Sequence, residues 1–262
     1  MPHRLDLLDD RLKAVYARPL VLVVGAPHSG FAAMGAMLDA HPEMRCAPDG
    51  HFTDRFAVPL KDVLGDYNSG LEGGAAAFTQ GDFLYLVRTA VALTLAKLEP
   101  DDTVRLLGCA AAVHAHNLDF WELMAPDLKV LHVVRDGRSA AAAALDEALD
   151  NAGAEPGTDS WYGAVDAAAY AWTDATRTAC GFGASRPERY HELRWEDLAG
   201  DPDTHLGAAL RFLEVRADAE ALAACLARLP AAAEPRTRLD GRALDRLLKH
   251  QGPVLRQFGY TG

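Results

Sequence analysis

Three short apolar runs along the chain, at residues 20–24, 104–109 and 129–134, predict strands that are buried on both faces. A fourth strand is predicted over residues 190–194. Helical patterns lie between these runs. Strands that alternate with helices over short connections indicate one parallel sheet. The predicted fold class is therefore α/β, a single domain over residues 1–262 whose P-loop-like parallel sheet is flanked by helices on both faces.

The helical segments are identified by apolar residues that recur at three- and four-residue intervals. They are expected at residues 4–17, 29–40, 83–98, 118–124 and 161–180, after residue 138, and from residue 201 onward. The segment 47–80 is weakly periodic and contains Gly, Asp and Pro. It is predicted to be a variable substrate loop with short helices.

The first predicted strand enters the turn of the sequence VLVVGAPHSGFAAMG, residues 21–35. A strand, a glycine-containing turn and a helix together suit an anion, because the first N–H groups of a helix are unpaired and carry partial positive charge. Gly25 and Gly30 have the GxxxxG spacing of a nucleotide-triphosphate loop. Phe31 and Ala32 stand where such a loop has Lys and Ser or Thr, so no magnesium ligand is evident and a kinase or NTPase is disfavoured.

Ligands of open parallel sheets bind at the carboxyl ends of the strands. Three segments fall there: residues 25–30, 135–139 and 195–197. We therefore expect the glycine turn and Arg135 to lie close together. A cation directly after a buried strand is costly unless an anion meets it, and the alternative partner for Arg135 is a carboxylate of Glu196 or Asp197.

The composition and charge of the chain disfavour several classes of partner. The chain has 262 residues and a formal net charge of −11, which disfavours a nucleic-acid or anionic-membrane partner. No segment has a signal peptide's pattern or the ~20 apolar residues of a membrane span. The four cysteines are scattered without metal-ligand spacing, so we expect a reduced, cytoplasmic protein with no metal site.

Four segments, in order along the chain, resemble the PAPS-dependent sulfotransferases of bacterial type. GAPHSG, followed by a helix and His41-Pro42, is similar to their 5′-phosphosulfate loop. VLHVVRDGRSAAAAAL is similar to their 3′-phosphate segment, YHELRWEDLAGDP to their RYEDL…DP element, and RQFGY to their LGY ending. The resemblance implies transfer of a sulfuryl group from PAPS (3′-phosphoadenylyl sulfate) to a small-molecule acceptor, in secondary metabolism.

The resemblance also implies roles for individual residues. His28 would be catalytic in the loop, and Asp49 or His51 would be the base that deprotonates the acceptor. Arg135 and Ser139 would bind the 3′-phosphate. The loop residues that would bind the phosphosulfate are Gly25, Ala26, Pro27, His28, Ser29, Gly30 and Phe31.

This loop is degenerate, because several of its residues depart from the family pattern. His28 replaces the usual Arg or Lys, and an imidazole carries no fixed charge. Phe31 and Ala32 replace two hydroxyl residues, and Ala143 replaces a serine. The alternative interpretation is a protein with weak or no PAPS binding. Such a protein would be the partner subunit of a competent sulfotransferase, or would be repurposed for cyclisation or elimination. Homodimers and heteromers both remain open.

Overall fold

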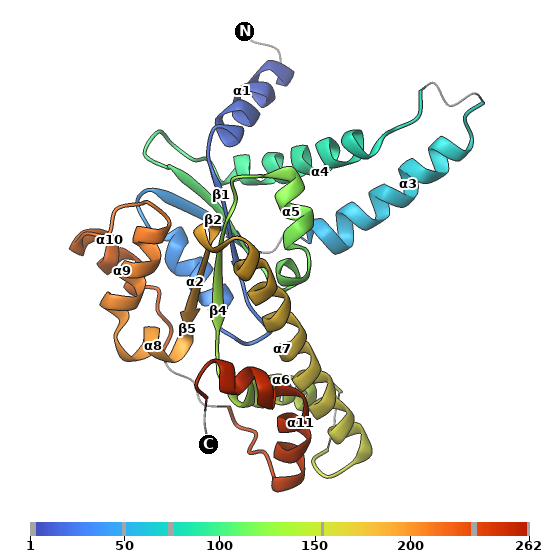
Figure 1. Ribbon diagram of the computed structural model, residues 1–262. Coiled ribbons are helices and arrows are strands. Elements are labelled where there is room, and N and C mark those ends of the chain that lie inside the picture. Colours follow the sequence, from blue (N-terminus) through green and yellow to red (C-terminus); the bar gives the residue numbers. More distant parts are fainter. Residues whose placement is uncertain (1–3, 49–50, 73–75, 153–154, 232–234, 261–262) are drawn as a thin grey trace.

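The computed structural model describes residues 4–48, 51–72, 76–152, 155–231 and 235–260. Within them, five strands form one sheet in the order β2-β3-β1-β4-β5, and every neighbouring pair is parallel (Figure 1). The α/β fold with a parallel sheet is thus confirmed. The strands are β1 (Leu20–Val24), β2 (Met44–Pro48), β3 (Leu106–Ala110), β4 (Lys129–Val134) and β5 (Tyr190–Arg194).

The pleat of β1 divides the core into two layers. Val21 and Val23 point to one face of the sheet, whereas Leu22 and Val24 point to the other, and all four are fully buried. A strand buried on both faces has to be apolar throughout, which is why this run was recognisable from the sequence.

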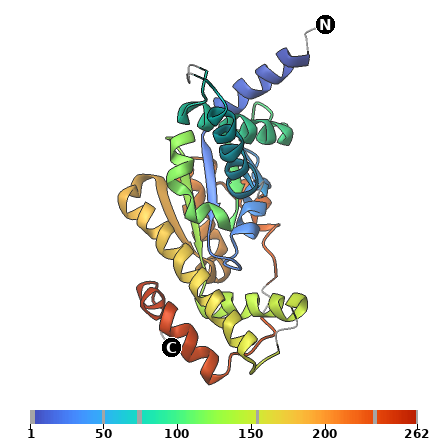
Figure 2. The same cartoon turned by 90° about the vertical axis from the view of Figure 1, so that its right-hand side faces the viewer.

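Helices cover both faces of the sheet (Figures 1 and 2). The Leu22 face packs against α1 (Arg4–Tyr16), α4 (Gln80–Leu95), α5 (Leu118–Met124), α7 (Asp159–Ser185) and α11 (Gly241–Gln257). The Val21 face packs against α2 (Phe31–Asp39), α8 (Trp195–Gly200), α9 (Pro202–Phe212) and α10 (Ala219–Leu226). No helix in the described part of the chain is long and apolar enough to cross a membrane.

The long helix α7 continues past the sheet and meets α6 (Gly137–Ala152) and α11 beyond the carboxyl ends of the strands (Figure 2). Leu145, Trp161, Val165 and Leu247 form a third apolar cluster there. This cluster anchors α6, the helix that follows Arg135. Short helical turns complete the chain: η1 (Phe52–Ala57), η2 (Ala96–Leu98), η3 (Ala112–His116) and η4 (Pro187–Arg189).

The predicted variable segment 47–80 differs most from the structure. It contains the end of an unpredicted edge strand, β2, the six-residue helical segment η1 and the twelve-residue helix α3 (Val58–Ser69). None of the α3 residues is buried, so its sequence lacks the core-facing periodicity that predicts a helix. α3 and α4 project from the body side by side (Figure 1).

Candidate functional site

The glycine turn lies where β1 ends and α2 begins. His28 and Gly30 both have left-handed backbone angles, with φ of 62° and 98°. A side chain on Gly30 would overlap the ring of Trp195, so only glycine fits. The turn is closed by the Ser29 N–H, which donates to the Ala26 carbonyl at 3.1 Å. The first N–H groups of α2, which follow this turn directly, have no acceptor within the helix.

Arg135 lies beside this turn, as the sequence predicted. Its Nη1 donates to the carbonyl oxygen of His28 at 3.4 Å, although the two residues are 107 positions apart. Among the described residues, no carboxylate forms an ion pair with Arg135; neither Glu196 nor Asp197 does so. A guanidinium without a carboxylate partner therefore stands next to the unpaired amides of α2.

Packing fixes the turn that carries Arg135. The indole N–H of Trp172 donates to the Arg135 carbonyl at 3.0 Å, and the Gln251 amide donates to the Gly137 carbonyl at 3.1 Å. A Cβ atom on Gly137 would overlap both partners. Helices α7 and α11 thus hold the start of α6 in place.

Two other charged side chains near the loop are already paired. His28 Nε2 lies 3.3 Å from the Glu147 carboxylate, which α6 presents from its third turn. Arg138 binds the Asp136 carboxylate through Nε and Nη2, and its own N–H is capped by the same group. Of the groups beside the turn that could attract an anion, the α2 amides and Arg135 therefore have no carboxylate contact, whereas the His28 imidazole and Arg138 each have one.

The segment that resembles the family's RYEDL element organises structure. Glu196 accepts the Asp136 N–H at 2.9 Å and the Tyr260 hydroxyl at 2.6 Å. Arg194 stacks on the Tyr260 ring, 4.6 Å from its centroid, and lies 3.8 Å from Asp197. Two segments that carried the resemblance, residues 190–202 and the terminal RQFGY, meet here.

The other predicted residues are distributed around the same edge. Ser139 lies half-buried in the first turn of α6, and Phe31 packs against the apolar cluster on the α2 face. His51, at the start of η1, contacts Asp54 at 3.2 Å. Asp49 lies outside the described residues. The Ser29 hydroxyl is fully buried and has no hydrogen-bond partner among the residues described.

His114 and His116, the two histidines of η3, have different surroundings. His114 is fully buried; its Nδ1 accepts the Trp121 indole N–H at 3.1 Å, and its Nε2 lies 3.3 Å from Cys109 Sγ. His116 is exposed and contacts Asp174 at 3.4 Å. His114 therefore has the contacts of a structural residue.

A cavity of about 590 Å³ opens between α3, α4 and α5. It begins beside η1 and η3, the segments that follow β2 and β3. Its wall is mainly apolar, with Lys61 as the one cation among the lining residues. The residues that define it include Thr53, Lys61, Leu64, Phe78, Phe83 and Phe120.

The residues present fit a phosphate group. The turn places Arg135 beside the start of α2, and only glycine at position 30 leaves room for the Trp195 ring that packs against the turn. The side chains of His28 and Arg138 contribute little further attraction for a phosphate, because Glu147 contacts His28 and Asp136 neutralises Arg138.

Comparison with known proteins identifies the class. The model of the sulfotransferase family matches residues 19–219, and the chain belongs to that family. The match spans β1 to β5 and the helices between them.

Solved structures with the same fold include two sulfotransferase domains and a mouse sulfotransferase. The domain from the curacin biosynthetic pathway has a TM-score of 0.62 and 16% identity, covering 93% of this chain and 98% of that one. The domain from the Synechococcus PCC 7002 olefin synthase has a TM-score of 0.57 and 18% identity, covering 94% and 96%. Mouse sulfotransferase SULT7A1 complexed with PAP has a TM-score of 0.50 and 12% identity, covering 95% and 94%.

Proposed function

We propose that this protein transfers a sulfuryl group from PAPS to a small-molecule acceptor of secondary metabolism. The observation that supports it is the position of Arg135, which lies without a carboxylate partner against the glycine turn at the carboxyl edge of the sheet. A donor with two anionic ends satisfies both groups, because one phosphate pairs with the α2 amides and the other with the guanidinium.

The residues of the site have separate roles in this proposal. The amides of residues 28–32 bind the 5′-phosphate end of the donor, and Arg135 with Ser139 binds the 3′-phosphate. When bound, PAPS supplies the sulfuryl group, which exchanges its phosphate oxygen for an acceptor oxygen or nitrogen. His28 donates a hydrogen bond toward the oxygen on which negative charge develops. His51 or Asp49 takes the acceptor's proton.

The acceptor is proposed to enter through the cavity between α3, α4 and α5, because that cavity begins at η1, directly after His51. Its apolar wall favours an acceptor with a large apolar part. The biosynthetic origin of the curacin and olefin synthase domains and the PAP bound to SULT7A1 agree with such a donor and such a pathway.

Titration with PAP, the desulfated product, tests the donor site. We expect micromolar binding that falls roughly ten- to hundredfold in Arg135→Ala, because a hydrogen bond to a charged group contributes about 1.5–3 kcal/mol. The exposed Arg228 is a matched control, and Arg228→Ala is expected to bind PAP like the unaltered protein. Unchanged affinity in Arg135→Ala would contradict the proposal.

The paired side chains favour a second candidate, a family member that has lost most of its affinity for PAPS and acts as a partner subunit. This second candidate predicts that the unaltered chain binds no measurable PAP. It also predicts that PAP binding is recovered when His28→Arg and Phe31→Thr are combined. Equal PAP affinity before and after this double substitution argues against it. Co-purification from the native host identifies a partner subunit.

A further inference from the structure

A second cavity lies at the amino ends of the strands, opposite the glycine turn. It has a volume of about 230 Å³ and is enclosed by the end of α1, the middle of α4, the end of α5 and the first residues of β1. A five-residue strand separates it from the turn by about 16 Å, since each residue advances ~3.3 Å. It is therefore separate from the proposed donor site.

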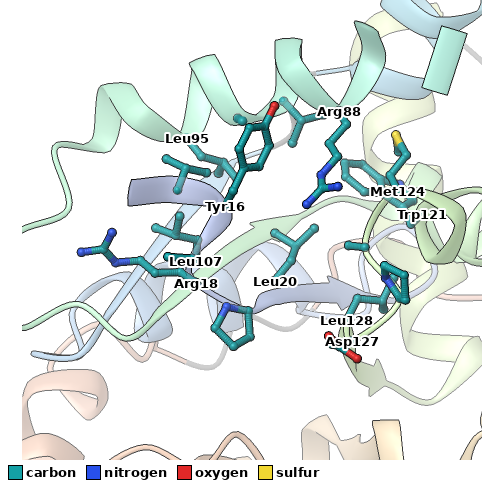
Figure 3. Close-up of a pocket in the computed structure, with 17 residues that line it drawn as sticks. Tyr16, Arg18, Leu20, Arg88, Leu95, Leu107, Trp121, Met124, Asp127 and Leu128 are labelled. Carbon is teal, nitrogen blue, oxygen red and sulfur yellow. The ribbon is translucent and has the colours of Figure 1, made fainter. Parts of the chain in front are cut away.

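The larger part of the wall of this cavity is apolar, and polar and charged groups make up the rest. Leu20, Val91, Leu95, Leu107 and Leu128 line it, with the ring of Trp121 at one end (Figure 3). A cavity of 150 Å³ accommodates benzene, so this volume holds a molecule of about ten non-hydrogen atoms.

One cation of the lining points toward this cavity, the side chain of Arg88, a residue that is exposed to solvent. Arg88 projects from α4 between Tyr16 and Met124, with its guanidinium toward the cavity (Figure 3). The guanidinium lies 4.7 Å from the centroid of the Tyr16 ring, and the Tyr16 hydroxyl is within 3.2 Å of the Thr89 hydroxyl, which holds the ring in place. In the described part of the structure, no carboxylate forms an ion pair with Arg88.

The other charged residues of the lining do not replace this cation or neutralise it. Arg18 points away from the cavity, and its nitrogens donate to the carbonyls of Val104, Ala14 and Asp101 (Figure 3). Asp127 lies at the rim near Leu128 and forms no ion pair with Arg88 (Figure 3). The cavity thus combines a largely apolar wall with one guanidinium, that of Arg88, directed into it.

We propose that this cavity binds a small amphipathic carboxylate, whose apolar part fills the space between α1, α4 and β3 and whose anionic group pairs with Arg88. Burial of the apolar body drives binding, and the guanidinium selects the anion through a charge-assisted hydrogen bond. A carboxylate of about ten non-hydrogen atoms, such as octanoate, matches the volume. The site is independent of the proposed sulfuryl transfer.

Calorimetric titration with octanoate tests this site, with 1-octanol as the neutral probe of the same length. We expect a dissociation constant of roughly 0.01–1 mM for octanoate, as is usual for a ligand of this size. Arg88→Gln is expected to weaken octanoate binding about tenfold or more and to leave 1-octanol binding unchanged. Ala125→Phe, which fills the cavity from its edge, is expected to abolish the binding of both.

Three controls make the result decisive. Arg228→Gln removes an exposed arginine elsewhere and should bind octanoate like the unaltered protein. Arg135→Ala should lose PAP and keep octanoate, which separates this site from the donor site. The proposal is overturned if octanoate binds Arg88→Gln as tightly as the unaltered chain, or if the folded protein binds none at concentrations below octanoate's micelle formation.

Discussion

At the scale of single residues, the glycine turn lies beside one carboxylate, that of Glu147, which the sequence resemblance did not indicate. Glu147 lies 3.3 Å from His28 Nε2, and 62% of its side chain is exposed. A negative charge at this position repels a phosphate bound to the turn. The same carboxylate contacts the ring nitrogen of His28, so a hydrogen bond from His28 to the donor competes with this contact. We therefore expect Glu147, on the third turn of α6, to lower the affinity of the glycine turn for an anion.

We expect Glu147→Gln to tighten PAP binding by about two- to fivefold, since an exposed ion pair contributes only ~0.2–1 kcal/mol. Isothermal titration of the unaltered and substituted chains measures the change. Asp150→Asn, one turn further along α6, is the matched control, because Asp150 pairs with Arg236 and does not contact His28. Weaker PAP binding in Glu147→Gln would show that the carboxylate positions His28 for the ligand.

At the scale of elements, the α3–α4 projection is the least supported part of the described chain. α3 buries no residue, and its exposed apolar side chains include Val58, Val63 and Tyr67. α4 begins with a capping box in which Thr79 Oγ1 accepts the Asp82 N–H at 3.2 Å and the Asp82 carboxylate accepts the Thr79 N–H at 2.8 Å. These local hydrogen bonds stabilise the exposed first turn of α4, whereas Val87, Val91 and Leu95 anchor its later turns in the core.

Removal of this cap should loosen the start of α4. Thr79→Ala is expected to cost about 1 kcal/mol of local stability and to speed amide hydrogen exchange in the first turn of α4 several-fold. Exchange in β1 and β4 should stay the same. Ser69→Ala, at the end of α3, removes a hydroxyl that bonds only the Asp66 carbonyl and is the control. Equal exchange in Thr79→Ala and the unaltered chain would show that packing, rather than the cap, fixes α4.

At the scale of the whole molecule, the centre of the sheet contains a histidine that stays neutral. Burial lowers the pKa of His132 to about 3, and its Nδ1 lies 2.6 Å from the Tyr190 hydroxyl. Between pH 6.5 and 3 the unfolded chain takes up a proton at this residue that the folded chain does not. The free energy of unfolding therefore falls as the pH falls through this window.

The contribution of His132 is at most ~1.4 kcal/mol per pH unit. Chemical denaturation at several pH values between 4 and 7 should therefore give a shallower decline in stability for His132→Gln than for the unaltered protein, whatever the absolute stability of the variant. His116→Gln removes an exposed histidine and should keep the original slope. Parallel slopes in His132→Gln and the unaltered chain would show that His132 does not remain neutral in the folded state.

The central strands of the sheet were predictable because a strand that is buried on both faces has a largely apolar sequence. The runs at β1 and β4 are apolar at nearly every position, so both strands were predicted from residues 20–24 and 129–134 alone. β2 is a five-residue edge strand that contains Arg45 and ends at Pro48, and α3 buries nothing. Neither segment carries a periodic apolar pattern, so β2 was not predicted, and for the region of α3 the sequence indicated only short helices without bounds.

The candidate site also has a part that the sequence predicted and a part that it did not. The chain order of strands and turns already placed the glycine turn and Arg135 at one edge, because parallel strands bring their carboxyl ends together. The pairing of His28 with Glu147, and the cavity that Arg88 enters, depend on the packing of helices whose partners are distant in sequence. By itself the amino-acid sequence therefore determined the parallel sheet and the glycine turn at its carboxyl edge, since local burial and backbone requirements specify both. Only the tertiary structure decided which charges remain unpaired, because an ion pair depends on distances between side chains that helix packing alone sets.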